Sequence, residues 1–212
     1  MTGKKFVHII DDEDSIRRSA GYILKTSGYS VETWASGTAF LKEARSAEEG
    51  CILLDVRMPD IDGLEVQRIL TERGIAMPVI IMTGHGDISI AVQAMKAGAV
   101  DFLEKPFEKA VLIDAIERAF DRVHSAQDAA ADAARANLII GALTGREQEV
   151  LEGLAQGLPN KTIAYDLGIS SRTVEVHRAN LMAKLHVHSL SDALRIAFAA
   201  GMGHKDLTAI NT

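Results

Sequence analysis

Short apolar runs alternate with longer amphipathic stretches along the first 120 residues of the chain. Between the runs, apolar residues recur every three or four positions, as they do on a helix that packs one face on a core. Gly28, Gly74 and Gly98 each close such a stretch, where a left-handed helix cap is expected. The apolar runs, which have the length of strands, are Phe6–Ile10, Val31–Trp34, Cys51–Leu54, Val79–Met82 and Val100–Leu103.

This alternation predicts an α/β domain with a five-stranded parallel sheet. Consecutive strand–helix units join parallel strands through right-handed crossovers, which gives a doubly wound sheet with helices on both faces. The central runs are almost continuously apolar, as strands that are covered on both faces require.

Residues 143–201 show a different pattern, that of four short helices. Thr144 and Glu147 have the spacing of a capping box at the start of the first helix. Asn160 is expected to cap the second helix, and Gly168 lies in the tight turn before the third. Two short helices across a glycine-containing turn are typical of a helix-turn-helix, so the segment predicts an all-α, four-helix DNA-binding domain.

The stretch between these patterns is rich in alanine and lacks glycine and proline. Because alanine is the best helix former, we expect the fifth helix to continue through much of residues 125–135. This spacer is either a solvated helix or part of a dimer seam. The predicted organisation is therefore an α/β domain over residues 1–122, a helical linker over 123–141 and a helix-turn-helix domain over 142–206.

Composition narrows the expected setting of the protein. The net charge of the 212 residues is −6, and residues 125–212 hold eight Lys and Arg against nine Asp and Glu, so DNA binding needs a local basic patch. The single cysteine, Cys51, cannot form an internal disulfide, which fits a reducing cytoplasm. No apolar window approaches the ~18–20 residues of a membrane span, so we expect a cytoplasmic protein without a membrane partner.

Polar residues stand directly after four of the predicted strands. They are Asp11, Asp12, Asp55, Thr83 and Lys105. The carboxyl ends of parallel strands share one edge of the sheet, where ligands bind. Three carboxylates, a hydroxyl and an ammonium at that edge indicate a site for a divalent cation and a phosphoryl group.

Mg²⁺ is the expected cofactor, because it prefers a few hard oxygen ligands. Asp12 and Asp55 are expected to be direct ligands, Asp11 a nearby or water-mediated one, and the carbonyl of Arg57 a backbone ligand. Taken alone, an acidic residue after a strand is often only a helix cap, and the joint spacing carries the prediction.

Short motifs surround these positions. They are Asp11-Asp12-Glu13, Asp55-Val56-Arg57-Met58-Pro59 with Asp62-Gly63, Thr83-Gly84-His85, Lys96-Ala97-Gly98-Ala99 and Lys105-Pro106-Phe107. Residues 1–122 thereby resemble the receiver domain of two-component response regulators. The resemblance implies a flavodoxin-like strand order 2-1-3-4-5 and Mg²⁺-dependent phosphoryl transfer from a sensor histidine kinase to Asp55. It also places Thr83 and Lys105 at the phosphoryl group and Phe102 at the aromatic switch position.

The stretches Leu158–Leu167 and Ser171–Leu181 resemble the LuxR/NarL-type output domain. At helical period, Val174, Leu181 and Leu185 share one face and should be buried. The opposite face suits the major groove, where Glu175 can accept from a cytosine amino group, and basic residues nearby suit phosphate contacts. The residues expected at DNA are Lys161, Arg172, Thr173, Glu175, Val176, Arg178, Ala179 and Lys184.

Three stretches, Gly84–Asp87, Glu104–Phe107 and Thr173–Asn180, resemble the FixJ family of rhizobial nitrogen-fixation activators. That resemblance implies a haem-based oxygen-sensing kinase, promoter DNA and RNA polymerase as partners. The predicted function is a transcription factor in which phosphorylated Asp55 draws Thr83 and Lys105 inward, lets Phe102 repack and produces a homodimer. Such a protein is not an enzyme, apart from its own phosphorylation and slow dephosphorylation.

Two alternatives stay open at this point. One is a Mg²⁺-dependent phosphohydrolase with Asp55 as nucleophile, although Arg57 stands where haloacid-dehalogenase-like enzymes place a second aspartate. The other is a DNA-binding module that works without phosphorylation, which an incomplete acidic site would favour.

Overall fold

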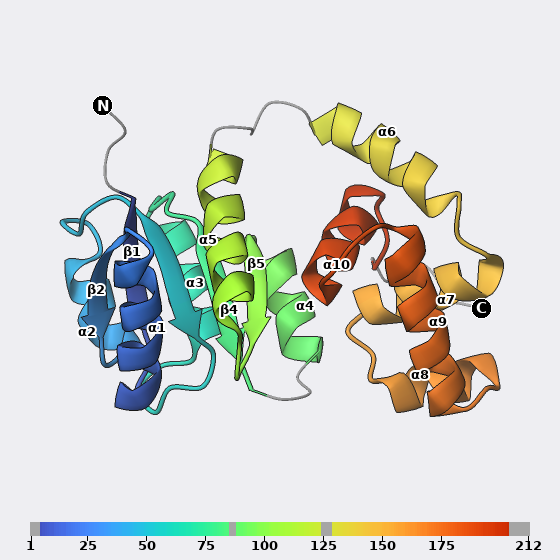
Figure 1. Cartoon of the computed structure of the whole chain (residues 1–212), viewed down its shortest axis with the longest axis horizontal. Helices are drawn as coiled ribbons and strands as arrows, with labels where there is room; N and C mark the ends of the chain where they lie inside the picture. Colours follow the sequence, from blue (N-terminus) through green and yellow to red (C-terminus); the bar gives the residue numbers. More distant parts are fainter. Residues whose placement is uncertain (1–4, 85–87, 124–128, 204–212) are drawn as a thin grey trace. The chain divides into compact units, whose positions relative to one another are not determined.

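The computed structural model describes residues 5–84, 88–123 and 129–203. The chain forms two compact units, one containing residues 1–87 and 93–126 and the other containing residues 88–92 and 127–212 (Figure 1). None of the helices in the described parts combines the length and the apolarity that crossing a membrane requires.

The first unit is a five-stranded parallel sheet in the order β2-β1-β3-β4-β5, which confirms the predicted fold and strand order. Each predicted apolar run forms a strand, with bounds that shift by one residue at most. The strands are β1 Phe6–Ile10, β2 Ser30–Trp34, β3 Cys51–Asp55, β4 Val79–Thr83 and β5 Asp101–Glu104. The helices are α1 Asp14–Thr26, α2 Gly37–Glu43, α3 Gly63–Glu72, α4 Ile88–Lys96 and α5 Lys109–Val123.

Both faces of the sheet are covered (Figure 1). Ile9, Leu53 and Ile80 pack in one core cluster with apolar residues of α1 and α5. The alternate strand residues Ile10 and Leu54 are also fully buried, beneath the helices of the other face. Burial on both faces explains why the central strands are apolar almost throughout and why, apart from the fully buried His8 of β1, their polar residues stand at the ends.

The second unit contains α6 Ala129–Ile140, α7 Gly145–Ala155, α8 Asn160–Leu167, α9 Ser171–Lys184 and α10 Leu190–Ala199. α6 covers much of the predicted helical linker, and the junction at residues 124–128, where α5 was expected to run on, lies outside the described residues. The capping box is present, since the Thr144 amide donates to Glu147 Oε2 and the Glu147 amide to Thr144 Oγ1. The predicted stripe Val174, Leu181 and Leu185 is buried.

One predicted helix start was wrong. Asn160 is the first residue of α8, and Pro159 takes the cap position, because its extended backbone turns its carbonyl toward the amides of Thr162 and Ile163. At α1 the cap residue is Glu13, without a side-chain cap bond, and Asp14 lies inside the first turn.

Candidate functional site

Three carboxylates meet at the carboxyl ends of two neighbouring strands. Asp11 follows β1, Asp55 ends β3, and the strands pair through Ile10 and Leu54. One oxygen of each carboxylate of Asp11, Asp12 and Asp55 lies within 4.8 Å of the others. Asp11 is fully buried and Asp55 nearly so, whereas Asp12 is exposed. The predicted acidic residues are therefore brought together, with two of the charges largely removed from water.

Lys105 crosses to this cluster from the end of β5. Its ammonium donates to Asp11 Oδ2 and to Asp55 Oδ1, both at 2.7 Å. Burial raises the pKa of the Asp55 carboxyl, and Lys105 offsets this only in part, while the charges of Asp11 and Asp12 add to it. Burial opposes the charge of Lys105, but its bonds to the two carboxylates outweigh that effect, so the Lys105 pKa is raised. The ammonium therefore stays charged at neutral pH.

Backbone amides hold the carboxylate of Asp11 and the main chain beside Asp55. Asp11 Oδ1 accepts from the Glu13 amide at 2.8 Å, and the Val56 amide, next to Asp55, donates to Met82 O at 3.0 Å. Asp55 therefore stands at the last rung of the ladder between β3 and β4, which fixes the position of its main chain.

Thr83 and Phe102 lie on the two strands beyond Asp55. Thr83 is nearly buried at the end of β4, and its hydroxyl donates to Gly84 O at 3.3 Å. Phe102 is half-buried on β5. The hydroxyl is thus engaged within its own loop in this structure, and an inward movement of Thr83 requires that bond to break.

The donor set fits a divalent cation. Three carboxylate oxygens within 4.8 Å of one another are the hard ligands that Mg²⁺ prefers, and exposed Asp12 leaves room for retained waters. Two negative charges remain after Lys105 is counted, which a divalent cation neutralises. Arg57 is exposed two residues beyond Asp55, and its carbonyl as a further ligand stays a prediction.

The second unit presents the predicted DNA-reading face on α9. Four of the predicted residues on this face are exposed, namely Arg172, Glu175, Val176 and Ala179. Val176 is 48% exposed, which is high for a large apolar residue. The Arg172 guanidinium pairs with Glu175 at 3.1 Å. An exposed surface of small and apolar side chains with one ion pair has the shape and chemistry that a major groove admits.

Comparison with known proteins covers both units. Residues 7–117 match the family described as the response regulator receiver domain, and residues 141–197 match bacterial regulatory proteins of the luxR family. The chain belongs to the response regulators. It is 49% identical to the transcriptional regulatory protein FixJ of Rhizobium meliloti (strain 1021) over 197 residues, which are 93% of this chain and 97% of that protein.

Other relatives of this response regulator have different names or known structures. The response regulator protein TmoT of Ectopseudomonas mendocina is 40% identical over 190 residues, which are 90% of this chain and 86% of that protein. The solved structure of full-length FixJ from B. japonicum has 42% identity and a TM-score of 0.56, covering 94% of this chain and 98% of that one.

The remaining residues that were predicted to contact DNA differ from one another in exposure and in bonding. Lys161 is exposed on α8, and Arg178 is half-buried on α9, as is Thr173. Lys184 donates at 2.7 Å to Glu147 Oε2, the capping-box carboxylate, which is nearly buried. This bond, with the Thr144 amide, lowers the pKa of Glu147 to about 2. Contact of Lys184 with a phosphate therefore competes with a bond inside the unit.

Sequence reasoning missed Tyr165, whose side chain is 87% exposed on α8, one helical turn after Lys161. The sequence signal that could have found it is an aromatic residue at a helix position where the pattern predicts an exposed polar residue. Its hydroxyl and ring are available beside the exposed Lys161 ammonium on the first helix of the helix-turn-helix, which crosses the DNA backbone in this motif.

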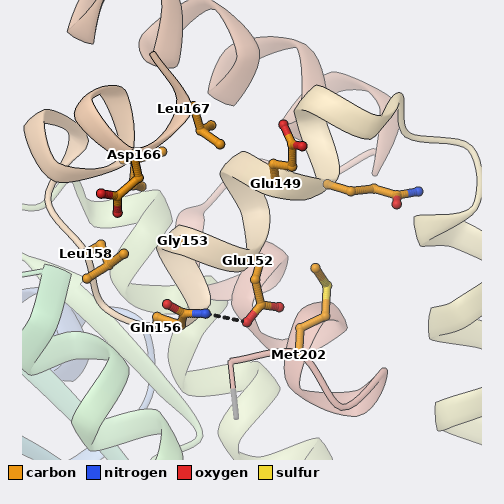
Figure 2. Close-up of a pocket in the computed structure, with 10 residues that line it drawn as sticks. Glu149, Glu152, Gly153, Gln156, Leu158, Asp166, Leu167 and Met202 are labelled. Atoms are coloured by element: carbon orange, nitrogen blue, oxygen red, sulfur yellow. Dashed lines mark hydrogen bonds between the residues drawn. The ribbon is translucent and has the colours of Figure 1, made fainter. Parts of the chain in front are cut away.

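A groove of about 430 Å³ lies between α7, α8 and the turn after α10 (Figure 2). Glu149, Glu152 and Asp166 bring carboxylates to it, and no Lys or Arg is among its lining residues. Glu152 accepts from Gln156 Nε2 at 2.8 Å. The groove therefore carries the wrong charge for DNA.

Proposed function

We propose that this response regulator is a transcription factor switched by phosphorylation of Asp55. The observation that carries the proposal is the pair of hydrogen bonds that the Lys105 ammonium donates to Asp11 and Asp55, beside the exposed Asp12. This arrangement combines a nucleophilic carboxylate, cation ligands and a fixed positive charge. In this proposal residues 1–122 receive the signal, residues 123–141 link the units and residues 142–206 read DNA.

Chemically, a carboxylate oxygen of Asp55 attacks the phosphorus of a phosphohistidine on a sensor kinase. The phosphorus–nitrogen bond breaks, the histidine leaves and an acyl phosphate forms. Lys105 holds Asp55 Oδ1, which leaves the second oxygen for attack. Asp11, Asp12, Asp55 and the carbonyl of Arg57 would hold a Mg²⁺, which would supply positive charge to the transferring group.

The acyl phosphate then changes the partners of the surrounding side chains. Lys105 exchanges its bond to Asp55 Oδ1 for a phosphoryl oxygen, the Thr83 hydroxyl leaves Gly84 O for another, and Phe102 repacks into the space that opens. Two receiver units then form a homodimer, a population shift that phosphate biases. The dimer brings two α9 helices to two half-sites in promoter DNA, which compensates for the weak local charge of one output unit.

The circuit is also a proposal. Similarity to FixJ proteins over nearly the whole chain favours transcriptional activation through RNA polymerase in an oxygen- or nitrogen-fixation-type circuit, with a haem-based oxygen sensor as kinase. The relatives TmoT and TodT, at 40% identity, show that the same architecture occurs under other names. A hydrolase is disfavoured, because Arg57 replaces the second acid that such enzymes use.

Light-scattering mass with and without acetyl phosphate and Mg²⁺ tests the switch, followed by binding to promoter DNA. We expect a monomer-to-dimer shift in the wild type and in Glu72→Gln, which removes an exposed carboxylate on α3 away from the strand ends. Asp55→Asn should show no shift. A dimer of Asp55→Asn that forms with the phosphodonor would refute the proposal, and an unchanged wild-type mass would refute phosphorylation-driven dimerisation.

A further inference from the structure

Arg17 contacts the loop that carries two of the three acidic residues. It lies in the first turn of α1, and its side chain is only 15% exposed. The Nη1 group donates to Asp11 O at 2.7 Å and to Asp12 O at 2.8 Å. The Nη2 group pairs with Asp14 at 3.2 Å. One guanidinium thus ties the first turn of the helix to both consecutive carbonyls of the acidic loop.

These bonds matter most for Asp12. The Asp11 side chain is already fixed by the Glu13 amide and by Lys105. The Asp12 side chain is exposed, so its carboxylate is placed mainly by the backbone to which it is attached. Because Arg17 holds the carbonyl of that residue and of the one before it, it sets the direction in which the Asp12 carboxylate leaves the chain.

The local charge supports a positioning role rather than an electrostatic one. A cation beside a divalent-metal site disfavours the metal, so Arg17 would weaken binding if its charge were its main effect. Asp14 pairs with both Arg17 and Arg18, through a different oxygen in each case, which offsets much of that charge. The planar fork of arginine donates in several fixed directions at once, which a lysine ammonium does not reproduce.

We propose that Arg17 is a positioning residue that preorganises the Asp11–Asp12 loop for a divalent cation. This inference rests on the proposed function, since it assumes that the acidic cluster binds Mg²⁺. Partners behind metal ligands typically contribute roughly 10–100-fold in affinity, so we expect Arg17→Ala to raise the Mg²⁺ dissociation constant at least tenfold. Acetyl-phosphate labelling of Asp55 should be impaired at low Mg²⁺ and recover at saturating Mg²⁺.

Arg18 provides a matched control. It pairs with the same Asp14 at 2.7 Å, but its side chain is 81% exposed. Arg18→Ala removes the same charge from the same helix, and its Mg²⁺ dissociation constant should stay within about twofold of wild type, as expected for an exposed ion pair. Arg17→Lys, which can hold the carbonyls only in part, should fall between wild type and Arg17→Ala.

Isothermal titration of the full chain with MgCl₂ measures binding without phosphorylation, and circular dichroism verifies folding. Equal affinity in Arg17→Ala and wild type would overturn the role of Arg17 while leaving the proposed function intact. Equal weakening in Arg17→Ala and Arg18→Ala would overturn it too, because charge rather than the carbonyl bonds would then be responsible. If Arg17→Ala does not fold, wild-type affinity in Arg17→Lys overturns the role. Wild type that fails to bind Mg²⁺ overturns both the role and the proposed metal site.

Discussion

The ammonium of Lys105 lies 2.7 Å from Oδ1 of Asp55, so the residue expected to receive the phosphoryl group is bound to a cation before any phosphate arrives. The same ammonium binds Asp11 Oδ2 at the same distance. Lys105 therefore competes with a divalent cation for carboxylate oxygens in the resting state. After phosphorylation, the same charge is available to the phosphoryl group.

Lys105→Met should separate these two roles. Without the competing ammonium, the affinity for Mg²⁺ should rise by roughly five- to tenfold, since about 1 kcal/mol of repulsion between charges is a modest value near a protein surface. Dimerisation on phosphorylation should be lost, because no cation is left to draw in the phosphoryl oxygen. Mg²⁺ titration and light scattering measure the two effects, and a lowered Mg²⁺ affinity would contradict the competition.

Asp55→Asn should stabilise the receiver unit at neutral pH. The pKa of Asp55 is raised in the folded state, chiefly by burial, so its contribution to stability is full below its unfolded pKa and is lost as pH rises through the folded value. Asparagine mimics the protonated form, and we expect a gain of about 1 kcal/mol at pH 7 that vanishes near pH 3. Urea unfolding followed by Trp34 fluorescence measures it, and a gain that persists at pH 3 would contradict this cause.

Most of the receiver unit could be predicted, because the spacing of its apolar residues determines both the strands and the positions left for polar side chains. Apolar runs covered on both faces leave most polar residues at strand ends, so Asp11, Asp55 and Thr83 stand out by position. The helical spacing of Val174 and Leu181 likewise predicted that they lie on the buried face of α9. In both cases the pattern and the burial have the same physical origin.

Contacts between distant side chains were not predictable in the same way. Lys184 looked like a phosphate ligand, yet it is bound to Glu147, which lies 37 positions earlier on another helix. The guanidinium of Arg17 turns back to two loop carbonyls, a contact that no feature of the sequence indicated. Periodicity shows which face a residue lies on, but not which partner its long side chain reaches.

The bond between Lys184 and Glu147 predicts an acid-sensitive DNA-binding unit. The folded pKa of Glu147 is about 2, well below its usual value, so the stabilisation is present above the unfolded pKa and is lost as pH falls from about 5 toward 2. Glu147→Gln keeps the capping-box form but neither pairs with Lys184 nor titrates. It should cost about 1 kcal/mol at pH 7 and nothing near pH 2. Scanning calorimetry of both proteins between pH 2 and pH 7 measures this difference in stability. An equal loss of stability at pH 2 and at pH 7 would exclude the ion pair as the cause.

Arg172 and Lys161 should affect DNA binding in different ways. Arg172→Ala removes a side chain on the exposed face of α9, and we expect a loss of roughly 1–3 kcal/mol with relaxed preference at one base pair. Lys161→Ala should weaken all sequences about equally and reduce the salt slope by about 1, as a phosphate contact does. Binding to a set of operator variants at several salt concentrations distinguishes them, and altered base preference in Lys161→Ala would contradict its assignment.

Gly63 links the packing of α3 to the geometry of Asp55. A Cβ at this position would lie 2.2 Å from Asp55 O and 2.9 Å from Val56 Cα, and the Gly63 amide donates to Val56 O at 2.8 Å. Any side chain there must displace the backbone that carries Asp55, the proposed phosphoacceptor. Gly63→Ala should cost roughly 1–3 kcal/mol and also slow acetyl-phosphate labelling of the folded protein.

Gly74→Ala is the control for a loss of stability alone. Its φ of 68° strains an alanine, but no atom lies within 4 Å of the added Cβ, and the residue follows α3 at the end away from Asp55. It should lower the unfolding free energy by about 1 kcal/mol without changing the labelling rate per folded molecule. Equal labelling rates in both variants would mean that Asp55 tolerates the displacement, and that the close approach of Gly63 serves packing only.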